Sequence, residues 1–185
     1  MTANEITFSP EKAVESVLYI ASKVVTPTIH EVLKIRYFAD KLHLAKYGWM
    51  ASGDDYVAMR FGPVGSGTYN LMKAARGDES GFIHPRFAEL VKGSLAVDSD
   101  RKSLVVLREP NAAILSKADI ACLDDALRQY GNMPFDVRTE LSHDGAWKKA
   151  WDSASEDEVG ASPMQVESIA RTLDNADEVV AHLRN

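Results

Sequence analysis

Three glycines in the segment GPVGSGTY, at positions 62, 65 and 67, come closest to the pattern of a phosphate-binding loop. A P-loop requires Lys and then Ser or Thr after its last glycine, and a dinucleotide-binding loop requires G-x-G-x-x-G. The segment has neither pattern, and Pro63 lacks the backbone N–H that a phosphate cradle would use. Because glycine tolerates backbone angles that other residues avoid, we interpret the segment as a turn from a strand into a helix.

Five histidines and a single cysteine are the remaining candidates for metal or nucleophilic chemistry. No two histidines are three or four residues apart, and none stands at metal-ligand spacing from Cys122. The aspartates at positions 119, 124 and 125 disfavour a thiolate at this cysteine. We therefore predict a packed, inert Cys122, no metal site and no cofactor.

Two carboxylate pairs, Asp54-Asp55 and Asp124-Asp125, have the residue types of acid–base catalysts. The first pair falls in an expected turn and the second on the polar side of an expected helix, so we interpret both as solvated surface charge. No motif of a nucleophilic serine is present. The sequence thus predicts a protein that is not an enzyme. The alternative is an enzyme of unrecorded chemistry, in which His143 works with a carboxylate.

Composition narrows the class of protein further. The chain has 185 residues and a formal net charge of −6, without a basic stripe, so nucleic-acid binding is not predicted. The lone cysteine fits a reducing compartment. No signal peptide precedes the first expected helix, and no apolar run reaches 18 residues. These features predict a cytoplasmic protein that does not enter membranes.

Helix-start signals place the long elements. Ser9-Pro10-Glu11 predicts a helix that runs to about Lys23, and Thr28 with Glu31 predicts a capping box that opens a helix over 28–46. The second helix is apolar around most of its circumference, which is typical of a buried central helix. Shorter helices are expected over 69–75, 86–92, 117–130 and 134–141, followed by a short piece that carries two tryptophans.

Strand signals are few and short. Residues 56–61 read as one strand, and 95–97 with 103–107 read as a hairpin. Because strands do not alternate with long helices, a doubly wound sheet is excluded. The predicted fold class is α+β and predominantly α-helical, with a central buried helix and a small antiparallel sheet of about three short strands.

The C-terminal part is expected to be separate from the main domain. Residues 8–155 form the predicted domain, and residues 156–185 form a polar, acidic linker and a last helix that starts at Ser162-Pro163. The apolar residues of this helix have heptad spacing: Val166, Ile169, Leu173, Ala176, Val180 and Leu183. This face either packs on its own domain or is offered to a partner, and Asn175 weakens the helix there. The oligomeric state stays open.

Two stretches carry a resemblance to a known family. HEVLKIRYFADKLHLAKYG (30–48) and GDDYVAMRFGPVGSGTY (53–69) resemble the core of the Panacea domain, the SocA-like antitoxin family. LSKADIACLDDALRQYGNM (115–133) and ELSHDGAWKKA (140–150) are similar to its second half. The resemblance covers about residues 10–152 in the family's order, and Arg36 departs from the lysine that the family often has.

The resemblance implies an antitoxin of a bacterial toxin–antitoxin system, which binds and neutralises a cognate protein toxin. It also implies an adaptor role that promotes degradation of the toxin by the ClpXP protease, with sequestration alone as the alternative. A transcriptional or scaffold module is a further alternative, although no helix-turn-helix with basic contacts is evident. The expected partner-binding residues are Tyr47, Trp49, Tyr56, Arg60, Tyr69, His143 and Trp147.

Overall fold

A computed structural model of the chain describes residues 7–78, 84–154 and 160–184. Its elements, in chain order, are α1 (Pro10–Ala21), α2 (Ile29–Tyr47), β1 (Tyr56–Met59), β2 (Gly62–Gly65), α3 (Ser66–Ala75), α4 (Pro85–Lys92), β3 (Leu95–Val97), β4 (Leu104–Val106), the 3-10 helix η1 (Ala112–Ile114), α5 (Lys117–Tyr130), α6 (Phe135–Ser142), α7 (Gly145–Asp152), β5 (Ser162–Pro163), α8 (Val166–Ala170) and α9 (Ala176–Leu183). The predominantly helical α+β prediction is confirmed.

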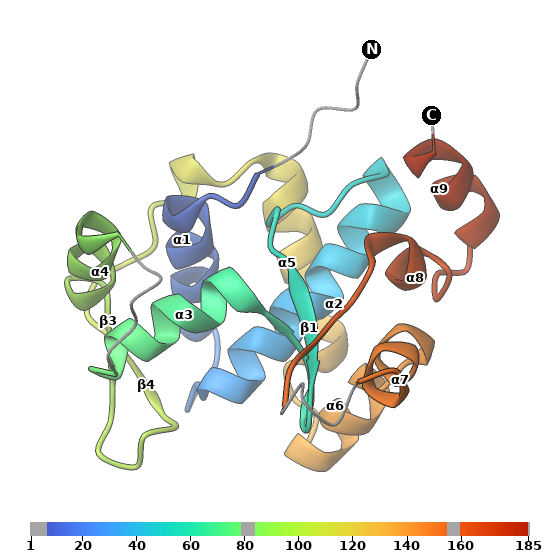
Figure 1. Cartoon of the computed structure of the whole chain (residues 1–185). Coiled ribbons are helices and arrows are strands. Elements are labelled where there is room, and N and C mark those ends of the chain that lie inside the picture. The colour runs from blue at the N-terminus through green and yellow to red at the C-terminus, as the bar shows by residue number, and fades with distance from the viewer. Residues whose placement is uncertain (1–6, 79–83, 155–159, 185) are drawn as a thin grey trace.

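Helix α2 is the centre of the molecule, as the sequence predicts. Figure 1 shows it crossing the middle of the fold, with α1, α3 and α4 to one side and α6 to α9 to the other. Val32, Ile35, Tyr37 and Leu44 are all completely buried. These side chains point in different directions around the helix. The helix is therefore covered on nearly all sides.

The two ends of α2 are capped in different ways. Thr28 accepts a hydrogen bond from the backbone N–H of Glu31, as predicted. The Glu31 side chain does not complete the capping box, because it pairs with the buried Arg138 at 2.7 Å. At the other end, Gly48 adopts a left-handed conformation with φ +84°, and the His182 ring lies where a Cβ atom would be. Glycine is thus required there by backbone angle and by space.

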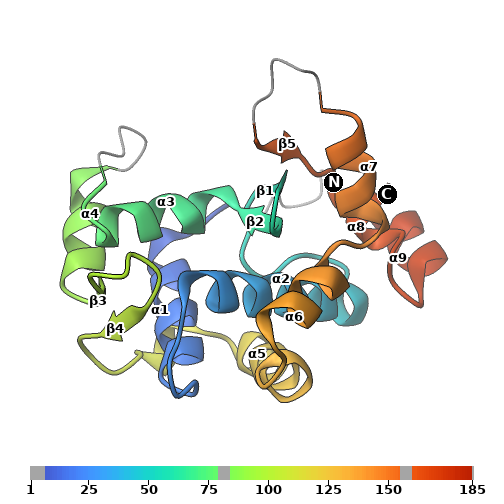
Figure 2. The same ribbon diagram turned by 90° about the horizontal axis from the view of Figure 1, so that it is seen from below.

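The strands that form the small sheet differ from the expected ones. Strand β1 pairs antiparallel with β2, which contradicts the interpretation of residues 62–65 as a turn. The chain reverses within Arg60 and Phe61, so the segment forms the second arm of a tight hairpin before α3 begins at Ser66. Figure 2 shows this hairpin between α3 and α7. The separate β3–β4 hairpin is confirmed.

The C-terminal segment also differs from the single expected helix. Ser162 and Pro163 form β5, which pairs with β1, and the helix that follows starts only at Val166. Residues between α8 and α9 break the heptad, and the Asn175 side chain donates to the carbonyl of Ala45 at the end of α2. The apolar face is therefore divided between two short helices that pack on the rest of the fold.

Candidate functional site

The structure distributes the predicted partner-binding residues over separate places. Tyr47 and Trp49 lie at the C-terminal end of α2, and Arg60 lies at the turn of the β1–β2 hairpin. His143 and Trp147 lie at the start of α7. The structure brings together the members of the first pair and of the last pair, but it does not gather all of these residues on one surface.

Two of the predicted partner-binding residues, Tyr56 and Tyr69, are buried or half-buried. Tyr56 is only 4% exposed, so its expected reach to the surface is wrong. Its hydroxyl donates to Asp40 at 2.7 Å, and burial together with the Asp40 charge raises its pKa well above the usual value. Tyr69 is half-buried on α3, where the Lys73 ammonium lies 4.8 Å from the ring centroid. Tyr56 is therefore part of the core.

A cluster of aromatic side chains surrounds the turn of the β1–β2 hairpin, and we call it the hairpin surface: Phe61, Phe135, Trp147 and Trp151. The rings of Phe61 and Phe135 are 5.8 Å apart, and both side chains are 51% exposed. Trp147 donates from its ring N–H to the carbonyl of Met59, two residues before Phe61, and Trp151 stacks on it at 5.3 Å. Phe61, Phe135 and Trp151 are exposed and Trp147 is half-buried, so two aromatic pairs lie at the surface on either side of the hairpin.

Arg60 and His143 flank the hairpin surface. The Arg60 guanidinium lies 5.3 Å from the centroid of the Phe61 ring, and His143 stacks on Trp147 at 3.6 Å. Burial, with the nearby Lys34, lowers the pKa of His143, which favours the neutral ring. The composition of this surface, which combines Trp, Phe and Arg, is that of residues that dominate protein–protein interfaces.

The hairpin is held from beneath by a buried lysine on α2. Lys34 is 1% exposed, and its ammonium donates to the carbonyl of Pro63 at 2.6 Å. A Cβ atom at Gly62 would collide with Ser142 Oγ and approach Lys34 Cε, and φ is +98° there, so this position requires glycine. No carboxylate of the described residues lies within 4.0 Å of Lys34. Burial lowers its pKa to about 7.

The arrangement around His143 does not favour the enzyme alternative. Its neighbour Asp144 is the nearest carboxylate in sequence, and that side chain is occupied by structural contacts. It caps α7 through the amides of Ala146 and Trp147, and it also accepts from Tyr37 and Lys41. A carboxylate so engaged is not poised to exchange protons with a substrate. In the part of the chain that the structure describes, no group of three or more potential metal ligands occurs either.

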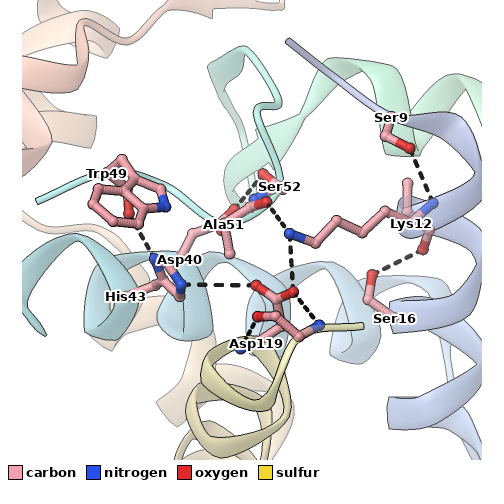
Figure 3. A network of polar contacts seen from close by, with 11 residues as sticks. Ser9, Lys12, Ser16, Asp40, His43, Trp49, Ala51, Ser52 and Asp119 are labelled. Carbon is pink, nitrogen blue, oxygen red and sulfur yellow. Dashed lines mark hydrogen bonds and ion pairs between the residues drawn. The ribbon is translucent and has the colours of Figure 1, made fainter. Parts of the chain in front are cut away.

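Tyr47 ends α2, and the exposed Trp49 follows on a loop that a buried polar network holds in place (Figure 3). His43 contacts the carbonyl of Trp49 through Nδ1 at 2.8 Å, which requires a proton on Nδ1 because a carbonyl only accepts. Its other nitrogen faces Asp119 at 3.7 Å. Asp119 in turn pairs at 2.9 Å with Lys12, which also donates to the carbonyl of Ala51. This network connects α1, α2 and α5 to the loop.

Electrostatics stabilise the charged state of Asp119 in this network. Burial opposes ionisation, but hydrogen bonds from Lys12 and Ser116 outweigh it, and the pKa of the carboxyl is lowered. The predicted N-cap at Ser116 is confirmed, with a complete capping box to Asp119. Cys122 is buried beside this site, as predicted, and burial raises the pKa of its thiol. The network is thus a set of paired groups that support the loop.

The interpretation of Asp54 as solvated surface charge is wrong. Asp54 is 6% exposed, and it accepts from the amides of Gly67 and Thr68 at the start of α3 and from the Thr68 hydroxyl. The amides that could have formed a phosphate cradle are therefore satisfied by a protein carboxylate. The same contact explains Gly65, where a Cβ atom would lie 2.5 Å from the carboxylate.

We expect Asp54→Ala to lower the free energy of unfolding by about 2–3 kcal/mol, because two amides and a hydroxyl lose their acceptor in a buried place. Urea denaturation measures the change. Asp55→Ala is the matched control, since Asp55 is adjacent and exposed, and it should change stability by less than about 0.5 kcal/mol. Equal effects of the two substitutions would contradict this role of Asp54.

Sequence reasoning missed three members of the hairpin surface: Phe61, Phe135 and Trp151. Aromatic residue type alone does not distinguish them from core residues such as Tyr37, which is completely buried in the same chain. A usable signal was the position of Phe61 directly before Gly62-Pro63, because a tight hairpin turn projects its residues outward.

Comparison with known proteins adds one match. A family model described as "Antitoxin SocA-like, Panacea domain" matches residues 32–148, from the first turns of α2 into α7. Neither the curated proteins nor the solved structures contain a match to the chain. The matched range includes Trp49, the β1–β2 hairpin, α6 and the start of α7. Among the described residues, no helix has the length and apolar character needed to cross a membrane.

Proposed function

The chain belongs to the SocA-like antitoxin family with a Panacea domain, and from this premise we propose that it binds and neutralises one cognate protein toxin. The observation that carries the proposal beyond the family is the hairpin surface. Trp, Phe and Arg side chains around one turn provide large contact area at low entropic cost, as the energetic centre of an interface requires. We assign the first contact with the toxin to this surface, with Arg60, His143 and Trp147 among the contact residues.

We further propose that the protein acts as an adaptor, delivering the bound toxin to the ClpXP protease. The family membership supports binding of a toxin in general, and the adaptor role is the more specific form of that activity. The alternative is that binding alone inactivates the toxin. The net charge of −6 suits a basic toxin, because opposite charges accelerate encounter.

Co-expression with the protein encoded by the neighbouring reading frame tests the proposal. If that protein arrests growth, this chain should restore growth and co-purify with it. In a strain that lacks ClpXP, an adaptor loses its protective effect while the complex persists, whereas sequestration protects equally in both strains. A toxic neighbour that this chain neither rescues nor binds would refute the assignment of that neighbour as its cognate toxin.

Trp49 tests whether the toxin reaches the other end of α2. This helix has 19 residues and is about 28 Å long; Trp49 follows its C-terminal end, whereas Phe135 of the hairpin surface contacts His30 near its N-terminal end. Trp49→Ala should weaken toxin binding and leave the melting temperature nearly unchanged, because the side chain is 46% exposed. Titration calorimetry and thermal unfolding measure the two effects. Unchanged affinity would restrict the interface to the hairpin end of the helix.

A further inference from the structure

Arg36, in the middle of α2, is a buried guanidinium with few partners. It is 5% exposed, and within the described residues it donates one hydrogen bond, from a terminal nitrogen to the Thr68 hydroxyl. No carboxylate oxygen of these residues lies within the 4.0 Å that defines an ion pair with it. A guanidinium carries five N–H donors, and leaving them unpaired in the interior is costly. The side chain therefore needs further acceptors.

A small cavity with polar and apolar walls lies beside this guanidinium. Its volume is about 30 Å³, and its lining includes Lys12, Arg36, Ala39, Asp40 and Asp119. A water molecule needs roughly 10–15 Å³ of such space. The cavity is therefore too small for an organic ligand but large enough for one or two waters. Its charged groups, two cations and two carboxylates, balance, which favours a neutral guest over an ion.

One carboxylate oxygen in the lining lacks a hydrogen bond. Asp119 is 4% exposed, and its Oδ2 atom accepts from Lys12 and from the amide of Ser116. Its Oδ1 atom has only His43 Nε2 nearby, at 3.7 Å, which is beyond hydrogen-bond distance, among the residues that the structure describes. A cavity with an underused donor group on one wall and an underused acceptor on another is suited to water.

We propose that this cavity binds one or two ordered water molecules, which accept hydrogen bonds from Arg36 and donate to Asp119. The water joins the two charged groups across the space between α2 and α5, where no direct ion pair forms. It thereby completes the network of Figure 3, which supports the loop that carries Trp49. This inference does not depend on the antitoxin proposal, since it rests on burial and hydrogen bonding in the free protein.

A substitution that fills the cavity tests the proposal through the sign of its effect. Ala39→Val adds two methyl groups to the lining. If the cavity holds bridging water, the substitution displaces it, strands the guanidinium and lowers the melting temperature by at least about 3 °C. If the cavity is dry, the added methyl groups fill a void and raise the melting temperature, which would overturn the proposal.

The same substitution in an Arg36→Met background separates displaced water from steric strain. Without the guanidinium, loss of the water costs less, so Ala39→Val should lower the melting temperature by less than half as much. An equal decrease in both backgrounds indicates overpacking and overturns the proposal. A high-resolution crystal structure of the unmodified protein gives the direct result: density within hydrogen-bond distance of Arg36 and Asp119 supports bound water, whereas an empty cavity or an ion overturns it.

Discussion

Replacement of Lys34 by methionine is expected to stabilise the protein at pH 7 by about 2 kcal/mol, which raises the melting temperature by roughly 4–8 °C. Lys34 is buried under the β1–β2 hairpin without a carboxylate partner among the described residues, where its one hydrogen bond goes to the carbonyl of Pro63. Methionine has a similar volume and no charge. The substitution loses one hydrogen bond but removes the larger cost of burying an unpaired ammonium.

The pH dependence of this effect follows from the shifted pKa of Lys34. Burial lowers its pKa from 10.5 to about 7, so between these values the unfolded chain binds more protons than the folded one. The free energy of unfolding should therefore rise with pH from about 7 toward 10, by on the order of 3 kcal/mol. Above pH 10 the trend reverses, because burial raises the pKa of tyrosines such as Tyr37 and Tyr56.

Urea denaturation of both proteins from pH 6 to pH 10 measures the Lys34 contribution as a difference, in which the other titrating groups cancel. The stabilising effect of Lys34→Met should be largest at pH 7 and below, and near pH 10 it should become a loss of about 1 kcal/mol, because neutral Lys34 keeps its hydrogen bond to Pro63. His30 and His143 lie near enough to Lys34 for its charge to act on them, and burial together with that charge lowers the pKa of both histidines. A difference that is constant across this pH range would show that the ammonium is not the destabilising group.

Local rules were sufficient for the helical frame. The all-round apolar pattern of α2, the cap at Ser116 and the polar turn between β3 and β4 each depend on neighbours within a few residues in sequence. Such signals do not depend on tertiary contacts, and the elements that they predict are present in the structure. The family resemblance was likewise carried by ordered local strings and is confirmed by the family model.

Contacts between distant residues were not accessible in the same way. Glu31 has the sequence of a capping-box residue but pairs with Arg138, 107 positions away. Asp54 stands in a segment typical of an exposed turn, but it caps α3. Ser162 and Pro163 have the residue types of a helix start, but they pair with β1. For Glu31 and Asp54, a carboxylate has two satisfactory sets of partners and packing decides between them; for Ser162 and Pro163, the neighbouring strand decides. The hairpin surface has the same origin, since Phe61 and Phe135 meet only in the folded chain.

The largest expected effect on binding is at Phe61. Phe61→Ala should lower the affinity for the cognate toxin at least about tenfold, because an aromatic side chain at the centre of an interface is typically worth more than 1.4 kcal/mol. The melting temperature should change by less than about 3 °C, since half of the side chain is exposed in the free protein. Titration calorimetry with the co-purified toxin measures the affinity, and thermal unfolding verifies the fold.

Leu107→Ala is the matched control for Phe61→Ala. The Leu107 side chain is 52% exposed, close to the 51% of Phe61. Leu107 follows β4, and Figure 1 shows β4 on the other side of the molecule from α6 and α7. If the toxin binds the hairpin surface, Leu107→Ala should change the affinity less than about twofold. If the two substitutions weaken binding equally, general loss of exposed apolar area explains the effect. If only Leu107→Ala weakens it, the toxin occupies the β3–β4 side, because a truncated contact residue affects only the interface to which it belongs.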